Sequence, residues 1–81
     1  MTEVVLYGKA GCHLCEDARA AIAEVRTRRE FDLTEVDVSL DPVLHARYGE
    51  RIPVVTIDGV EAFELGLSAP ELDRALATVT A

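Results

Sequence analysis

The stretch that most constrains this chain runs from Val4 to Cys15, where an apolar segment leads through a short turn into two cysteines. Val4 to Tyr7 has the length and apolar continuity of a buried strand, and a helical pattern begins at the cysteines. The Cys-x-x-Cys spacing places Cys12 at the exposed N-terminus of that helix and Cys15 one turn further along the same face. The stretch therefore predicts a strand, a turn and a helix that carries two neighbouring sulfurs.

The length of the chain, 81 residues, suffices for one domain but not for two separate cores. Apolar residues make up 49% of it, and only 5 glycines and 3 prolines interrupt them, so a modest core can form without a disulfide framework. We therefore interpret residues 1–81 as a single globular domain.

The formal net charge is -7, from 15 acidic residues against 8 lysines and arginines. Such a charge repels a phosphate backbone and an anionic membrane surface. The chain shows no signal peptide, and no apolar run approaches the roughly 18 residues that a membrane helix needs. We expect a soluble, cytoplasmic, monomeric protein that binds neither nucleic acid nor membrane.

Hydrophobic periodicity and turn residues predict the remaining elements. We expect a first helix from the cysteines to about Arg29, a second strand over residues 31–38, a short helix between Asp41 and Gly49, a hairpin over residues 54–63 with its turn at Asp58-Gly59, and a final helix capped by Ser68 and Glu71. Two strands joined by a helix of about fifteen residues form a parallel pair. The predicted order is β-α-β-α-β-β-α.

Apolar spacing also predicts which side chains are buried. The expected core comprises Cys15, Ala18, Ala21, Ile22 and Val25 from the first helix, Leu72, Ala75, Leu76 and Val79 from the last helix, and the aromatic residues Tyr7, Phe31 and Phe63. His45 is expected to be an exposed helix residue.

The cysteine pair carries the chemistry that the sequence predicts. A thiolate is the reactive form of cysteine, and the partial positive charge at a helix N-terminus favours that form at Cys12. Lys9 and a protonated His13 act in the same direction, whereas Glu16 and Asp17 oppose it. In a reducing compartment, such a pair beside a strand and helix indicates redox activity or metal binding.

The sequence gives less support to other roles for the cysteines. A zinc site normally takes four protein ligands, and beyond the cysteines the chain offers only His13, which points elsewhere, and His45 on a distant helix. A structural disulfide across so short a loop contributes only about 2 kcal/mol, and a reducing cytosol opposes it. A non-catalytic binding module and a metal or iron-sulfur carrier remain as alternatives to redox chemistry.

Two segments carry a resemblance to a known family. Residues 7–15, Tyr-Gly-Lys-Ala-Gly-Cys-His-Leu-Cys, resemble the Tyr-x-Lys-x-x-Cys-x-x-Cys site of glutaredoxins, and residues 52–55, Ile-Pro-Val-Val, resemble their cis-proline segment. The chain is also similar to short bacterial glutaredoxin-like proteins with a Cys-His-Leu-Cys site. The resemblance implies a thioredoxin-like α/β fold, with a four-stranded mixed sheet flanked by three helices.

The resemblance also implies roles for the two segments. Cys12 would be the attacking nucleophile and Cys15 the resolving thiol. The Ile52-Pro53 bond would be cis, with Pro53 beside the cysteines and the backbone of Ile52 paired with an extended substrate. The implied activity is dithiol-disulfide exchange that reduces protein or small-molecule disulfides, with no bound cofactor.

The expected reductant is glutathione, another low-molecular-weight thiol or a flavoprotein reductase. Lys9 and Arg51 are the residues expected to contact glutathione carboxylates, and His13, between the cysteines, is expected to tune the redox potential. The chain departs from glutaredoxins at three places. It has His-Leu between the cysteines, Arg-Ile before the proline, and Leu-Gly-Leu-Ser at residues 65–68, where glutaredoxins usually carry Pro-Tyr, Thr-Val and Gly-Gly-x-Asp.

Overall fold

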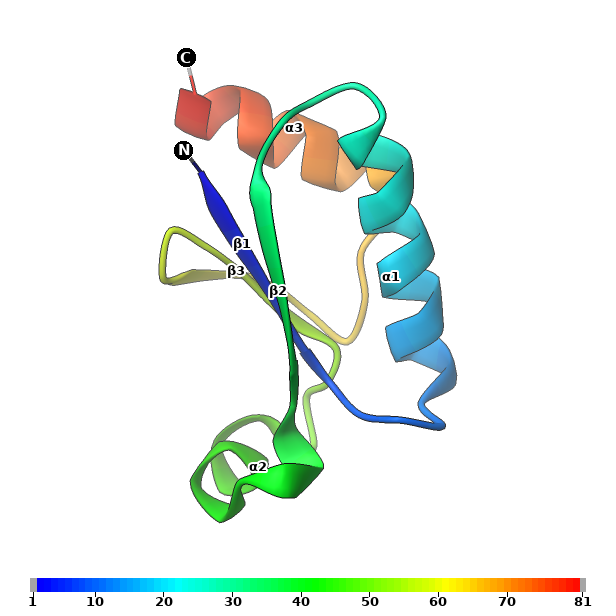
Figure 1. Cartoon of the computed structure of the whole chain (residues 1–81), viewed down its shortest axis with the longest axis vertical. Helices are drawn as coiled ribbons and strands as arrows, with labels where there is room; N and C mark the ends of the chain where they lie inside the picture. Colours follow the sequence, from blue (N-terminus) through cyan, green and yellow to red (C-terminus); the bar gives the residue numbers. More distant parts are fainter. Residues whose placement is uncertain (1, 81) are drawn as a thin grey trace.

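A computed structural model describes residues 2–80 of the chain (Figure 1). Its elements are β1 (Glu3–Gly8), α1 (His13–Arg26), β2 (Asp32–Asp37), a 3₁₀ turn (Val38–Leu40), α2 (Pro42–Tyr48), β3 (Val54–Ile57), β4 (Val60–Glu64) and α3 (Ala69–Thr80). This order confirms the predicted succession of strands and helices. No helix in the described part of the chain is long and apolar enough to cross a membrane.

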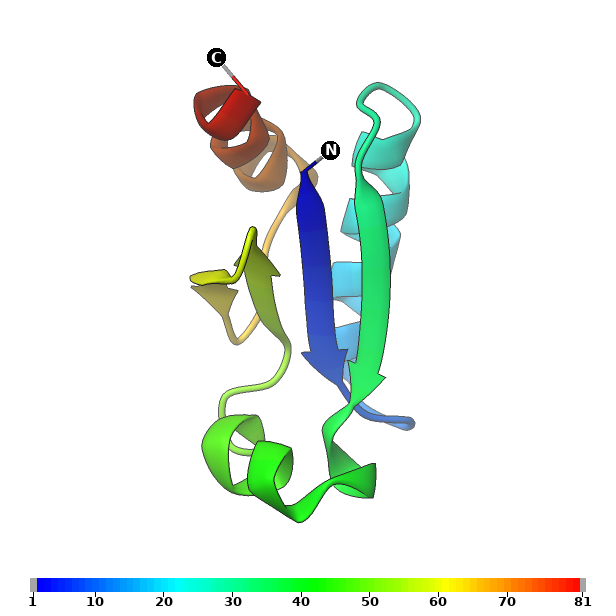
Figure 2. The same ribbon diagram turned by 60° about the vertical axis from the view of Figure 1, so that its left-hand side comes forward.

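The four strands form one mixed sheet in the order β2-β1-β3-β4. β1 pairs with β2 in parallel and with β3 in antiparallel, and β3 pairs with β4 in antiparallel. The first pair is parallel because α1 carries the chain back along the sheet before β2 begins. In Figure 2, α1 runs along β1 and β2, and α2 lies at the end of the sheet where these strands end. The end of β1, from which the chain continues to the two cysteines, therefore lies in the middle of the sheet.

The larger core fills the space between one face of the sheet and the helices α1 and α3. Because successive strand residues point to opposite faces, Val4 and Leu6 of β1 share this face with Val55 and Ile57 of β3. The helices contribute Ala18, Ile22 and Val25 from α1 and Ala69, Leu72 and Leu76 from α3, and Phe31 lies with them. Phe63 is partly buried and packs against this cluster, so both phenylalanines are core residues as predicted.

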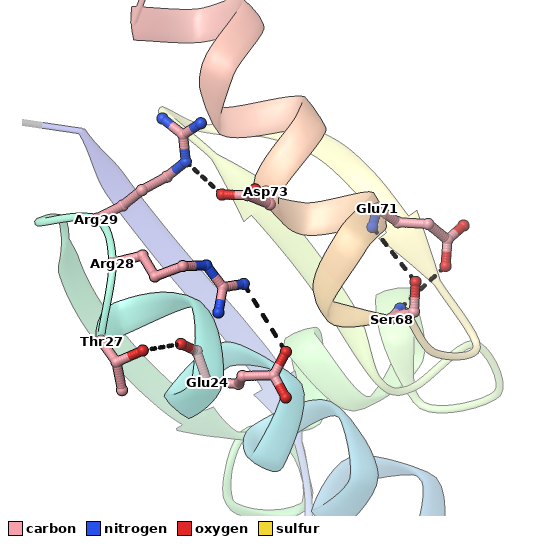
Figure 3. Close-up of polar contacts among 7 residues, drawn as sticks. All are labelled: Glu24, Thr27, Arg28, Arg29, Ser68, Glu71 and Asp73. Carbon is pink, nitrogen blue, oxygen red and sulfur yellow. Dashed lines mark hydrogen bonds and ion pairs between the residues drawn. The ribbon is translucent and has the colours of Figure 1, made fainter.

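The predicted helix starts are confirmed by their capping bonds. The Asp41 carboxylate accepts from the Val43 amide at 2.9 Å and so caps α2. At α3, the Ser68 amide donates to the Glu71 carboxylate at 2.9 Å, and the Glu71 amide donates to the Ser68 hydroxyl at 3.3 Å (Figure 3). These reciprocal bonds satisfy two backbone donors that a helix start leaves unpaired.

The first helix is shorter than predicted, ending at Arg26 and not near Arg29. The Thr27 hydroxyl donates to the Glu24 carbonyl at 2.6 Å and so takes up an acceptor at the end of the helix. The Arg29 guanidinium then pairs with Asp73 of α3 (Figure 3). The Thr27 and Arg28 amides donate to the carbonyls three residues earlier, those of Glu24 and Val25, so the helix ends in a tightened turn that leads to β2.

The predicted burial of Val79 is wrong, because its side chain is 48% exposed. Val79 lies beside Asp58 and Val60 at the tip of the β3–β4 hairpin, and both of these residues are themselves exposed. Ala69, at the other end of α3, is buried in the core instead. The apolar stripe of this helix is therefore shifted toward its N-terminus.

The difference in burial between Leu72 and Val79 can be tested by measuring how much each side chain stabilises the protein. Replacing the fully buried Leu72 by Ala should lower the free energy of unfolding by about 2–5 kcal/mol, because it leaves a cavity. Val79→Ala should change it by about 0.5 kcal/mol or less, because the side chain is half exposed. Urea titration of both variants measures the difference, and equal losses would contradict this description of α3.

Candidate active site

The turn after β1 places Cys12 as the N-cap of α1, which confirms its predicted position. Its sulfur accepts a hydrogen bond from the Cys15 amide at 3.3 Å, and its carbonyl accepts one from the Glu16 amide at 3.1 Å. Cys12 is partly exposed, whereas Cys15 is fully buried. The outer sulfur thus lies at the N-terminus of α1, next to the positive end of the helix dipole.

Gly8 sets how closely α1 approaches the strand. A Cβ atom on Gly8 would lie 2.9 Å from the Cys15 sulfur and 3.2 Å from the Cys15 Cβ, which is too close for either contact to persist unchanged. Only glycine therefore lets the first turn of α1 pack against the end of β1 as it does. Gly11 completes the turn with a φ of +77°, a conformation that glycine adopts without steric cost.

A second buried cluster lies beneath the cysteines and is called the site cluster here. It consists of the buried residues Cys15, Val38, Tyr48, Ile52 and Val54, with Tyr7, Cys12 and Leu44 packed against it. The cluster brings the Cys-x-x-Cys segment and the segment around Pro53 together, although they are far apart in the sequence. The Ile52-Pro53 peptide bond is cis, and both residues are buried.

The thiol of the inner cysteine is strongly perturbed by its surroundings. Burial raises the pKa of the Cys15 thiol to about 11, and its hydrogen bond with the Cys12 side chain acts in the same direction. The Lys9 backbone and the positive charge of Arg19 oppose the rise without cancelling it. Near neutral pH the inner cysteine is therefore a protonated thiol. A buried, protonated Cys15 suits a pair in which Cys12 reacts first.

Aromatic stacking builds the wall of the site on the side of α2. The rings of Tyr7 and Tyr48 stack with their centroids 4.5 Å apart and their planes 29° apart. The guanidinium groups of Arg47 and Arg51 each lie 5.4 Å from the centre of the Tyr48 ring. Sequence reasoning missed Tyr48. Its one signal was a large aromatic residue at the end of the short helix, directly before Gly49.

Arg51 lies beside the proline segment but is already paired. Its Nη1 donates to Glu61 at 2.7 Å and to Glu64 at 3.3 Å, and its Nη2 donates to the Arg47 carbonyl at 3.2 Å. A substrate carboxylate would have to compete with these two carboxylates of β4. No pattern in the sequence linked Glu61 and Glu64 to the site.

Lys9 lines a cavity of about 250 Å³ between the active-site turn, α1 and the edge strand β2, together with Arg19, Glu35 and Asp37. Hydrogen bonds from the Ser39 hydroxyl and amide lower the pKa of Asp37, and the Lys9 charge acts in the same direction. The Arg19 guanidinium pairs with Glu35. Each cation at this cavity therefore has an acidic neighbour.

Exposed apolar side chains flank the cysteines and the proline segment. His13 and Leu14, between the cysteines, are both exposed, and the Leu14 side chain is 48% accessible. Leu65 is 56% accessible and has a φ of +63°, which is uncommon for a residue other than glycine. Its amide donates to the Arg51 carbonyl at 3.0 Å. The loop after β4 is thus tied to the segment that precedes Ile52.

Within residues 2–80, no three His, Cys, Asp or Glu side chains are grouped so that they could hold a metal ion. His45 is exposed on α2, as expected. The groups that the structure gathers at this end of the sheet are two thiols, a buried proline segment and several paired charges.

Residues 3–77 match the model of a protein family described as "Glutaredoxin-like domain (DUF836)". This chain belongs to that family. Uncharacterised proteins from Mycobacterium tuberculosis and Mycobacterium bovis are 36% identical to this glutaredoxin-like chain over 64 residues, which cover 73% of it. The aligned part spans 66% of those relatives, just under two thirds of their length.

Solved structures confirm the thioredoxin-like fold. A structural genomics target protein from X. campestris superposes with a TM-score of 0.80 at 29% identity, covering 93% of this chain and 96% of that protein. A protein from Nitrosomonas europaea gives a TM-score of 0.77 at 25% identity, with coverage of 91% and 89%. Chloroplastic thioredoxin z gives 0.79 at 16% identity over 99% and 79%, which is a likeness of fold alone.

The Gly8 contact can be tested in this glutaredoxin-like domain by a double-mutant cycle. Gly8→Ala should destabilise the protein by about 1–3 kcal/mol, because the added methyl group meets the Cys15 sulfur. In a Cys15→Ala background the sulfur is gone, so Gly8→Ala should then lower the free energy of unfolding by at least about 0.5 kcal/mol less than it does in the wild-type protein. Urea unfolding of the four proteins measures the coupling, and strict additivity would contradict the contact.

The raised pKa of Cys15 predicts slow alkylation. At pH 8 a thiol with a pKa of about 11 is almost entirely protonated, so iodoacetamide should label Cys15 about a hundredfold more slowly in the native protein than in urea. The native rate should rise as the pH approaches 11. Mass spectrometry follows each cysteine separately. Labelling of native Cys15 within tenfold of the unfolded rate at pH 8 would argue against its burial as a thiol.

Proposed function

We propose that this protein is a thiol-disulfide oxidoreductase that reduces disulfides by dithiol exchange. The observation that carries the proposal is the difference between its two cysteines. Cys12 caps α1 and is partly exposed, whereas Cys15 is buried behind it with a raised pKa. Membership of the glutaredoxin-like family supports the same chemistry.

In the proposed first step, the Cys12 thiolate attacks one sulfur of a substrate disulfide. The substrate sulfur-sulfur bond breaks, a bond forms between Cys12 and the attacked sulfur, and the other substrate sulfur leaves as a thiolate. The amides at the start of α1 stabilise the attacking thiolate before the reaction. The product is a mixed disulfide on the outer cysteine.

In the second step, Cys15 loses its proton and attacks the Cys12 sulfur. A disulfide forms between the two cysteines, and the second half of the substrate leaves as a thiolate, which takes up from water the proton that Cys12 released when it ionised. The two protein thiols thus provide two electrons and two protons, and the substrate disulfide becomes two thiols. The thiolate released in the first step takes up the Cys15 proton, and because the pKa of Cys15 is about 11 this transfer is uphill and accompanies the attack on Cys12.

The remaining assignments belong to the same proposal. Glutathione, another low-molecular-weight thiol or a flavoprotein reductase returns the disulfide to two thiols, and no bound cofactor takes part. The substrate is a disulfide-containing protein or small molecule in the cytoplasm, and the protein acts as a monomer. The backbone of Ile52 pairs with the extended substrate beside Pro53, and His13 tunes the potential.

Trapping of the mixed disulfide tests the proposed function. Cys15→Ser should accumulate an adduct through Cys12, because the group that releases it is gone, and Cys12→Ser should lose insulin reduction entirely. Non-reducing gels and mass spectrometry detect the adduct, and circular dichroism confirms that both variants are folded.

Two outcomes would contradict this mechanism. If Cys15→Ser reduces protein disulfides at the wild-type rate without an adduct, the resolving role is wrong. If the folded wild-type protein reduces no disulfide, the domain is better described as a binding module that keeps its cysteines for another reason.

A further inference from the structure

We infer that Glu61 and Glu64 are specificity-determining residues that make the active site select uncharged or positively charged disulfides over anionic ones. The inference rests on the proposed function and names the substrate class of the same site. It follows from how the cations around the site cluster are partnered.

Arg51 is the cation closest in sequence to Pro53, and its guanidinium contacts Tyr48 of the site cluster. A free guanidinium at this place would form a paired hydrogen-bonded contact with a substrate carboxylate. Nη1 instead binds two carboxylates, at 2.7 Å and 3.3 Å. The positive charge of Arg51 is therefore more than balanced by its partners on β4.

The sheet register places these carboxylates on the strand that pairs with the segment directly after Pro53. Glu64 is the β-partner of Val54, the residue that directly follows Pro53, and Glu61 is the partner of Thr56. The amide of Leu65 also bonds to the Arg51 carbonyl, so the end of β4 and the proline segment are held together. Negative charge is thus built into the edge of the sheet next to the segment expected to bind substrate.

The other charges near the cysteines do not reverse this balance. Lys9 lies beside Asp37 at the cavity next to the active-site turn, and Glu16 lies in the first turn of α1. Arg47, over the Tyr48 ring, is a third cation. With Arg19 and Glu35 of the same cavity and Asp17 of α1 included, four cations stand against six carboxylates: Lys9, Arg19, Arg47 and Arg51 against Glu16, Asp17, Glu35, Asp37, Glu61 and Glu64.

The side chains of Arg51, Glu61 and Glu64 are between 37% and 53% exposed, so an approaching small molecule experiences their field through water. Interactions of such exposed charges are modest and are screened by salt. The expected selectivity is therefore small but measurable. The exposed side chains of Leu14 and Leu65 add apolar surface to the same region, which suits an uncharged partner.

Three small disulfides that differ only in their end groups test the inference. They are bis(2-hydroxyethyl) disulfide, which is neutral, cystamine, which is cationic, and 3,3′-dithiodipropionate, which is anionic. The rate at which each oxidises the reduced protein is divided by its rate with dithiothreitol, to remove differences in intrinsic reactivity. The normalised rate for the anionic disulfide should be about two- to fivefold below that for the neutral one at low salt. The difference should shrink in 1 M salt.

Variants that remove charge test whether Glu61 and Glu64 cause the slower reaction of the anionic disulfide. The double variant Glu61→Gln/Glu64→Gln should raise the ratio of the anionic rate to the neutral rate about two- to fivefold, because it frees Arg51. Adding Arg51→Gln should abolish that gain. The matched control, Glu24→Gln/Glu30→Gln, makes the same change in net charge, but Glu24 lies about 18 Å along α1 from the capping Cys12, so the ratio should not change.

The outcomes separate this inference from the proposed function. Reduction of all three disulfides at equal normalised rates, or an equal gain in the control double variant, overturns the selectivity and leaves disulfide exchange standing. If the folded wild-type protein reduces none of the three disulfides, the proposed function fails and the selectivity fails with it.

Discussion

The close packing of Gly8 against Cys15 is the contact on which the site depends. A side chain at position 8 would meet the Cys15 sulfur at 2.9 Å, so glycine alone lets the start of α1 lie against the end of the central strand. This contact buries the inner sulfur and leaves the outer one at the helix N-terminus. Burial then raises the pKa of the inner thiol, and the Cys15 amide donates a hydrogen bond to the outer sulfur. One steric condition thus makes two chemically similar residues different.

The surroundings of this contact link the cysteines to the rest of the fold. The site cluster joins the first turn of α1, the end of α2 and the start of β3 through the side chains of Cys15, Tyr48 and Val54. The Tyr48 ring stacks on Tyr7 and lies near two guanidinium groups, so contacts with three residues hold it in place. Side-chain packing therefore holds the segment around Pro53 next to the cysteines.

Charge pairing shapes the outer surface of the same region. The exposed edge strand β4 carries Glu61 and Glu64, and acidic residues at a sheet edge also discourage pairing with another chain. Their bonds to Arg51 hold the edge strand to the proline segment. The same carboxylates thus hold the edge strand to the proline segment and, in our proposal, influence the choice of substrate.

The sequence by itself determined the order of the elements and the position of the two cysteines at the start of α1. Local signals were sufficient for these features. The Asp41 and Ser68 caps, the Asp58-Gly59 turn and the spacing of Ala18, Ile22 and Val25 all act within a few residues of one another. The resemblance to glutaredoxins extended this to the sheet and to the partnership of the cysteines with Pro53.

Only the tertiary structure decided which charges are free and which side chains are buried at the ends of elements. The pairing of Arg51 with Glu61 and Glu64, the role of Tyr48 and the exposure of Val79 depend on neighbours from other elements. Helical spacing cannot show where a sheet ends, and a list of charges cannot show which of them meet. The physical reason is that burial and ion pairing are set by distances across the fold, whereas propensity and capping are set along the chain.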